Sequence, residues 1–167
     1  MTIIRMYHTV EGSKRPTHYR EAWWEPEAAE FVLHHGPVGE TGKTTVEKVS
    51  DESEAELLLA SFEQQNITDQ YIDADSIDHE SFKIKIKFKG AKPTQIESRN
   101  AEKFSIEYSG LLGWRGLGIV DEVQPAPNEA AFLLTVHTVH SKKAIKLAHE
   151  ALKKTDIRAD RMRIEQD

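Results

Sequence analysis

The segment of residues 37–44, PVGETGKT, comes nearest in this sequence to a catalytic motif. The phosphate loop of nucleotide hydrolases has the pattern GxxxxGK followed by Ser or Thr, but Pro37 stands where the first glycine belongs. Such a loop also leads into a helix whose amide groups face the phosphates. Residues 44–49, TTVEKV, are instead rich in β-branched side chains and predict a strand. We therefore predict a turn between two strands, which explains Gly39 and Gly42.

The eight histidines do not predict a metal site or a catalytic site. His137 and His140 are three residues apart on or just after a predicted strand, so their side chains would point to opposite faces. His149 precedes Glu150, but Lys153 stands where the zinc motif HExxH has its second histidine. The sequence has no cysteine, so any metal would need histidine and carboxylate ligands. We predict no catalytic residue, no metal and no cofactor.

Aromatic and charged side chains are the candidates for contact with another protein. Trp114 and Arg115 stand between glycines, and such residues often anchor interfaces because they bury large areas and donate directed hydrogen bonds. Trp23 and Trp24 are neighbours on a predicted strand, so one of them could lie outside the core. Burial against their own sheet stays an open alternative for these tryptophans. The predicted partner-binding residues are Trp24, Trp114, Arg115, Asp73, Asp75 and Asp78.

A strand with alternating lysines opens the second half of the sequence. Residues 82–89, FKIKIKFK, alternate between apolar and basic, which predicts a half-buried strand with one cationic face. This face could be solvated, with lysines that block edge-to-edge pairing. It could also bind phosphate groups or an acidic protein. The residues of this alternative nucleic-acid site are Lys83, Lys85, Lys87 and Lys89.

The composition, with 38% hydrophobic and 30% charged residues, is typical of a globular protein. No apolar run approaches the roughly 18 residues of a membrane helix, and the N-terminus does not have the pattern of a signal peptide. We therefore expect a cytoplasmic protein without membrane contact. Residues 1–80 hold 6 Lys and Arg against 17 Asp and Glu, whereas residues 81–167 hold 16 against 11. The halves could dock on each other or present separate faces to partners.

The first half predicts an antiparallel meander followed by a helix. Strands are expected over residues 2–10, 17–24, 29–35 and 44–49. The helix is expected from Ser50 or Asp51 to about Gln65, because a cap, an acidic first turn and an apolar face coincide there. Residues 68–81 are rich in aspartate and predict an acidic linker or loop. They lack the glycine and glutamate that a calcium loop requires.

The second half predicts another α+β unit. Strands are expected over residues 82–89, 103–108, 117–123, 130–139 and 161–165, with a helix from Ser141 to about Lys154. The sequence therefore predicts an α+β fold of two small subdomains, residues 1–67 and 82–167. Each subdomain is expected to have an antiparallel sheet packed by a helix.

Residues 31 to about 71 resemble a WGR domain, a small module named after its Trp-Gly-Arg signature. Residues 31–39, FVLHHGPVG, match the strand of that family that ends in WGRxG, and residues 53–62, SEAELLLASF, match its helix. His35 stands in place of the tryptophan and Pro37 in place of the arginine, while Gly36 and Gly39 agree. The resemblance implies contacts with neighbouring domains or nucleic acid, as in poly(ADP-ribose) polymerases. The acidic first half favours protein contacts, because affinity for DNA comes largely from neutralised phosphates.

The leading functional prediction is a protein without a catalytic centre that binds another protein. An acidic inhibitor or immunity protein is one form of it, because acidic surfaces speed association with basic targets. One alternative is nucleic-acid binding by the basic second half, with base stacking on Trp114 and phosphate contacts from Arg115. The other alternative is an enzyme whose site forms only in the fold. The sequence does not predict an oligomeric state.

Overall fold

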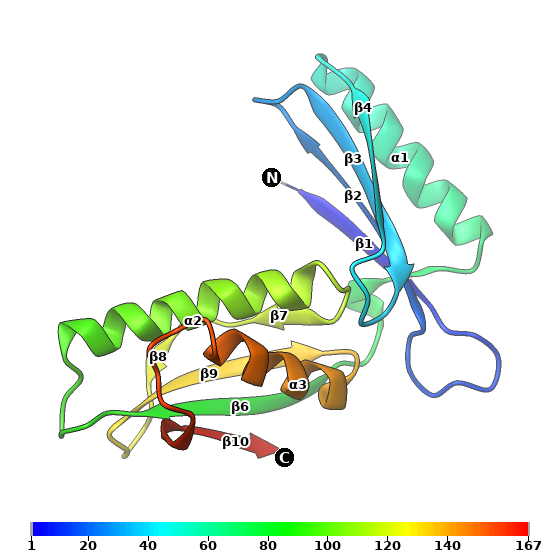
Figure 1. The fold of residues 1–167 in the computed structure, drawn as a ribbon. Coiled ribbons are helices and arrows are strands. Elements are labelled where there is room, and N and C mark those ends of the chain that lie inside the picture. Colours follow the sequence, from blue (N-terminus) through cyan, green and yellow to red (C-terminus); the bar gives the residue numbers. More distant parts are fainter. Residues whose placement is uncertain (1, 167) are drawn as a thin grey trace. The chain divides into compact units, whose positions relative to one another are not determined.

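Two compact α+β units make up residues 2–166, which are the residues described by the computed structural model (Figure 1). One unit ends at Asp78 and the other begins at His79. Each unit contains one antiparallel sheet, and the described residues form three α-helices and ten strands. The predicted α+β fold is confirmed. No helix among the described residues is both long enough and apolar enough to cross a bilayer.

The first unit is the predicted meander with a helix on one face. Its sheet has the order β4-β3-β2-β1-β5, and α1 spans Glu52–Thr68. The strands are β1 (Ile3–His8), β2 (His18–Glu25), β3 (Glu30–Pro37), β4 (Lys43–Lys48) and β5 (Ile72–Asp73). Asp51 caps α1, because its side chain accepts a hydrogen bond from the Ser53 amide at 2.7 Å.

Helix α1 covers only part of its sheet face. It packs against β1 and β2, and its buried Ala55 joins Ala22 and Phe31 of the sheet in one apolar core. Leu33 of β3 and Leu58 and Phe62 of α1 border this core but are only half buried. The strands β3 and β4 therefore keep part of this face uncovered.

The predicted acidic linker is partly regular structure. Helix α1 continues to Thr68, and β5 pairs with β1 through the partners Met6 and Asp73. A short 3-10 helix, η1 (Ala74–Ser76), follows, and the Asp73 side chain caps it by accepting from the Asp75 amide at 2.9 Å. The low apolar content of this segment predicts a loop, but main-chain pairing with β1 does not require apolar side chains.

The second unit has the strand and helix order of a split βαβ motif. Its sheet has the order β10-β6-β9-β7, with β8 paired to β9. The elements are β6 (Glu80–Lys87), α2 (Gln95–Gly113), β7 (Gly118–Val120), β8 (Gln124–Pro125), β9 (Ala131–Thr138), α3 (Ser141–Leu152), η2 (Ala159–Arg161) and β10 (Met162–Gln166). The helices α2 and α3 contact each other, and the Tyr108 hydroxyl donates to the Ala144 carbonyl at 2.7 Å.

The strand predicted over residues 103–108 is wrong, because this segment lies inside α2. The helix begins with a capping box in which Thr94 and Glu97 bond to each other's backbone amides at 3.1 and 3.0 Å. The predicted strand over residues 117–123 shortens to β7. The side chains that α2 buries recur at the spacing of one helix face. They are Ala101, Phe104, Tyr108 and Leu112.

Candidate functional site

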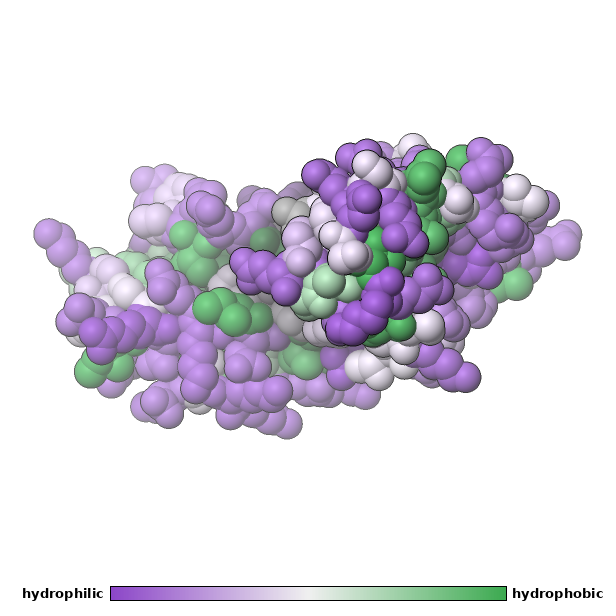
Figure 2. All heavy atoms as spheres, turned by 90° about the horizontal axis from the view of Figure 1, so that it is seen from above, coloured by the Kyte–Doolittle hydropathy of each residue, from purple (hydrophilic) through white to green (hydrophobic). Residues whose placement is uncertain are grey.

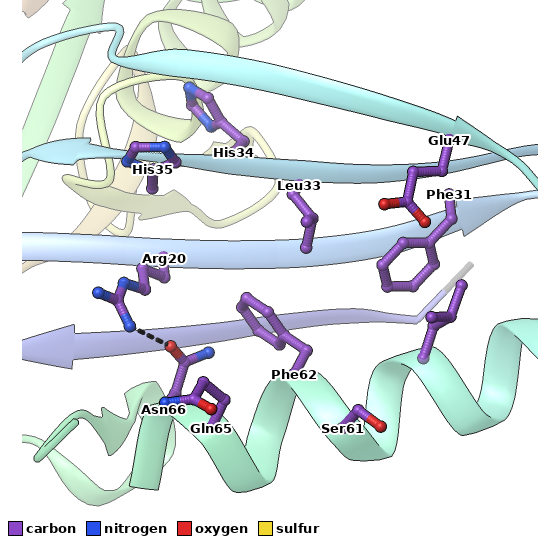
Figure 3. A pocket seen from close by; sticks show the side chains of 11 residues that line it. Arg20, Phe31, Leu33, His34, His35, Glu47, Ser61, Phe62, Gln65 and Asn66 are labelled. Carbon is purple, nitrogen blue, oxygen red and sulfur yellow. Dashed lines mark hydrogen bonds between the residues drawn. The ribbon is translucent and has the colours of Figure 1, made fainter. Parts of the chain in front are cut away.

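An open cleft of about 540 Å³ lies between α1 and β3 of the first unit (Figure 3). Phe31 and Leu33 of β3 line one side, and Leu58 and Phe62 of α1 line the other. Its volume lies within the range of roughly 300 to 1,000 Å³ that is usual for ligand sites. The cleft is therefore the candidate functional site of the first unit.

Residues two apart on a strand, and residues four apart on a helix, have side chains on the same face, which places these apolar side chains on the two walls of the cleft. Phe31 and Leu33 are two residues apart on β3 and lie opposite Glu47 and Thr45 of β4, so all four occupy one face of the sheet. Leu58 and Phe62 are one helical turn apart on α1, and both pack against the apolar core of this unit. Figure 3 shows the Phe62 ring on the side of α1 that faces the sheet. The uncovered part of the sheet face and the flank of α1 thus form the two walls.

A polar cluster closes one end of the cleft. Arg20 of β2 donates from Nη1 to Asn66 Oδ1 at 2.8 Å and to Asp69 Oδ2 at 2.6 Å. The Arg20 guanidinium also lies 4.2 Å from the centre of the Tyr71 ring. The hydrogen bond from Arg20 lowers the pKa of Asp69. Asp69 is thus ionised at neutral pH and balances the charge of Arg20.

Asn66 lines the cleft and has a buried hydrogen-bond donor without an acceptor among the described residues. Its side chain is 2% exposed, and its Nδ2 has no acceptor among the described residues. Arginine can only donate, so it must bind Oδ1, and the amide orientation follows from this contact. Nδ2 then points away from Arg20, toward Phe62 (Figure 3). A buried donor without a partner costs about 1 to 3 kcal/mol, which favours an acceptor brought in by a ligand.

The titratable side chains around the cleft are spread over its border. His35 and Glu47 are exposed and lie toward different ends of the cleft, and the His34 ring points away from α1 (Figure 3). His34 Nδ1 lies 2.6 Å from Glu21 Oε1, on the opposite face of the sheet. Among the side chains drawn in Figure 3, the marked hydrogen bond joins Arg20 to Asn66.

The predicted partner-binding residues are distributed over both units. Trp24 is half buried on the α1 side of its sheet and donates to the Val49 carbonyl at 3.2 Å, while Trp23 lies on the other face and is 8% exposed. Neither tryptophan of this pair is freely exposed. Trp114 is 48% exposed at the C-terminal end of α2, next to the half-buried Arg115. In the first unit, Asp73 is half buried, whereas Asp75 and Asp78 are exposed.

The predicted lysine face exists on β6, but its central lysine is paired. Lys83, Lys85 and Lys87 alternate with three buried apolar residues, and Lys89 lies beyond the end of the strand. Lys85 Nζ lies 2.7 Å from Glu129 and 3.1 Å from Glu165. Arg163 of β10 lies 2.8 Å from each of the same two carboxylates. This ion-pair cluster neutralises the middle of the cationic face.

The ion-pair cluster predicts an unusually acidic Glu129. Its hydrogen bond with Lys85 has the larger effect and its hydrogen bond with Arg163 the next, and they lower the pKa of Glu129 to about 2. Because the pKa falls on folding, the stabilisation from Glu129 is complete above about pH 4.5 and is lost as the pH falls toward 2. Carbon NMR of the Glu129 side-chain carboxyl during an acid titration measures this pKa directly. Lys85→Met should raise it, and a value near 4.5 in the unchanged protein would show that the cluster is open in solution.

Arg20 and Asn66 were absent from the sequence-based candidates. They are 46 residues apart and meet only when α1 packs on the sheet. One signal was present in the sequence: Asn66 follows Phe62 by four residues and so belongs to the buried face of α1, where an amide needs a partner. Among residues 2–166, no three or more side chains of the types His, Cys, Asp and Glu gather as a metal ion would require.

Comparisons with known proteins give the chain no family. No protein-family model, no curated protein and no solved structure matches it. The resemblance of residues 31–71 to WGR domains therefore stays a prediction.

Proposed function

We propose that this protein binds another protein and that the cleft beside α1 is its binding surface. The observation that carries the proposal is the incomplete cover of one sheet face, which leaves Leu33, Leu58 and Phe62 half exposed around a hollow. Apolar walls with a few directed polar groups are typical of recognition sites. The WGR-like order of strand, turn and helix supports the same role, because that resemblance implies contacts with other domains. The absence of cysteine is compatible with a cytoplasmic location.

The charge around the cleft favours a neutral or basic partner. Helix α1 carries four glutamates and no lysine, arginine or histidine. Glu47 stands on the opposite border, and the one arginine at the cleft is balanced by Asp69. An acidic surface accelerates association with a basic partner, and salt weakens this attraction. An inhibitor or immunity protein for a basic target fits this pattern.

Figure 2 shows the hydropathy of one face of the molecule. On the face seen in Figure 2, hydrophilic side chains predominate, and the hydrophobic ones form separate small patches. A broad apolar interface of the kind that permanent complexes use is not visible on that face. A small hollow that accepts part of a partner is consistent with this surface.

Two arginine substitutions on α1 test the proposal. Ser61 lines the cleft and is exposed, so Ser61→Arg should fill the cleft without removing a core side chain. Gln64→Arg adds the same side chain three residues further on, outside the cleft. The tagged proteins are used to capture partners from their own cells at low and moderate salt after nuclease treatment. One stoichiometric partner should remain on the unchanged protein and on Gln64→Arg, but fall at least about tenfold on Ser61→Arg.

Other results of this capture would contradict the proposal. Equal capture of the partner by Ser61→Arg and Gln64→Arg would show that the cleft is not the binding surface. Material that disappears with nuclease would instead favour nucleic-acid binding.

A further inference from the structure

We infer that the cleft holds an extended segment of the partner and binds its main chain, with Asn66 Nδ2 donating to a backbone carbonyl and an apolar side chain lying between Leu33 and Phe62. This inference rests on the proposed function. It adds the conformation of the bound segment and the group that recognises it.

The unused donor of Asn66 selects the conformation of the segment. A helix uses its own carbonyls in its main-chain hydrogen bonds, except in its last turn. An extended segment has main-chain carbonyls that are free to accept. Because Nδ2 is buried and has no acceptor among the described residues, a free carbonyl satisfies it where a helical one would not.

The neighbouring Gln65 offers the complementary group. Its Nε2 donates to Asp69 Oδ1 at 3.2 Å, which fixes this amide and leaves its carbonyl oxygen as an acceptor at the border of the cleft. A donor on Asn66 and an acceptor on Gln65 match the carbonyl and the N–H of a main chain that passes them. A side chain in such a segment that points into the cleft would meet Leu33, Leu58 and Phe62.

Charge excludes a carboxylate as the preferred acceptor. The guanidinium of Arg20 is already balanced by Asp69, so it leaves no net positive charge for a second anion. The four glutamates of α1 and the 17 acidic residues within residues 1–80 repel negative groups. A neutral carbonyl in a segment flanked by lysine or arginine therefore fits better than an acidic side chain or a C-terminal carboxylate.

The probe is a peptide selected from a random display library on the full chain and required not to bind Ser61→Arg. Asn66→Asp replaces the donor with an acceptor of the same shape while keeping an oxygen for Arg20. We expect Asn66→Asp to lower the affinity for the peptide at least about tenfold. Gln64→Glu makes the same chemical change outside the cleft and should leave the affinity within twofold. The melting temperature of each variant shows whether its fold is kept.

A thioamide scan of the same peptide locates the accepting carbonyl. Replacing one main-chain oxygen at a time with sulfur should weaken binding most at one position, and this loss should shrink in Asn66→Asp. Unchanged affinity in a folded Asn66→Asp, a selected peptide that binds as a helix, or no selected peptide at all would overturn the inference. If Ser61→Arg abolishes partner capture while Asn66→Asp has no effect, only this inference fails and the proposed function stands.

Discussion

Replacing Glu21 with alanine is expected to lower the free energy of unfolding of the first unit by about 3 to 5 kcal/mol. Glu21 is 3% exposed, and its Oε2 accepts from both Nε and Nη2 of Arg5 at 2.8 Å. Its Oε1 lies 2.6 Å from Nδ1 of His34, which is 1% exposed. Burial alone would lower the pKa of Arg5, but the Glu21 carboxylate, followed by Tyr7, outweighs this effect, so the pKa is raised. The alanine variant would leave a largely buried cation without this counter-ion.

Tryptophan fluorescence during denaturant unfolding can isolate this effect. In a Trp114→Phe background the remaining tryptophans, Trp23 and Trp24, both belong to the first unit. Glu30→Ala is the matched control on the same sheet, because Glu30 pairs with Lys48, whose side chain is 76% exposed. Such a surface pair contributes at most about 1 kcal/mol. Equal losses in Glu21→Ala and Glu30→Ala would show that water replaces the lost carboxylate.

Local patterns predicted β1 to β4 and α1 of the first unit well because each of these elements has its own sequence signature. Its strands are separated by turn residues, and α1 begins at a capping aspartate and continues with apolar residues on one face. The strand boundaries differ from the predicted ones by only one or two residues. Short connections between neighbouring strands then determine the order of the meander, since consecutive strands usually pair.

The helix α2 was missed because its sequence carries conflicting patterns. Residues 103–108, KFSIEY, alternate locally as in a strand, and Gly110 and Gly113 suggested a loop. In the structure Gly110 lies on an exposed helical position, where an added side chain would meet no atom within 4 Å. Packing of Tyr108 onto α3 supports this part of the helix. The tertiary contact therefore outweighs the low helix propensity of glycine.

The candidate site could not be predicted because its groups come from distant parts of the sequence. Arg20 lies on β2, Leu33 on β3 and Asn66 near the end of α1, and only the packing of α1 brings them together. Patterns along the sequence show which residues share a face of one element. They do not show that α1 packs against β1 and β2 and leaves part of β3 uncovered. That choice depends on side-chain packing over the whole unit.

Gly42→Ala is expected to destabilise the first unit by about 3 kcal/mol or more, through both strain and a steric clash. Gly42 has a φ of +63°, and a Cβ there would overlap the carbonyl oxygen of His35 and lie 2.9 Å from the Tyr19 hydroxyl. That hydroxyl donates to the Glu40 carbonyl at 2.7 Å and ties the loop to β2. A shift of the loop would break this bond. The glycine of the apparent phosphate motif thus allows two backbone segments to approach closely.

Gly12→Ala separates the two causes of this loss. Gly12 also has a positive φ, +89°, but an added Cβ there would meet no atom within 4 Å. Gly12→Ala should therefore lower the free energy of unfolding only by the cost of placing alanine at a positive φ, about 1 kcal/mol. Denaturant unfolding gives the two losses, and hydrogen exchange of the β4 amides shows whether the hairpin opens in Gly42→Ala. Similar losses in both variants would mean that the loop moves aside at little cost. A clearly larger loss in Gly42→Ala would establish that close packing of the turn against β3 requires this glycine.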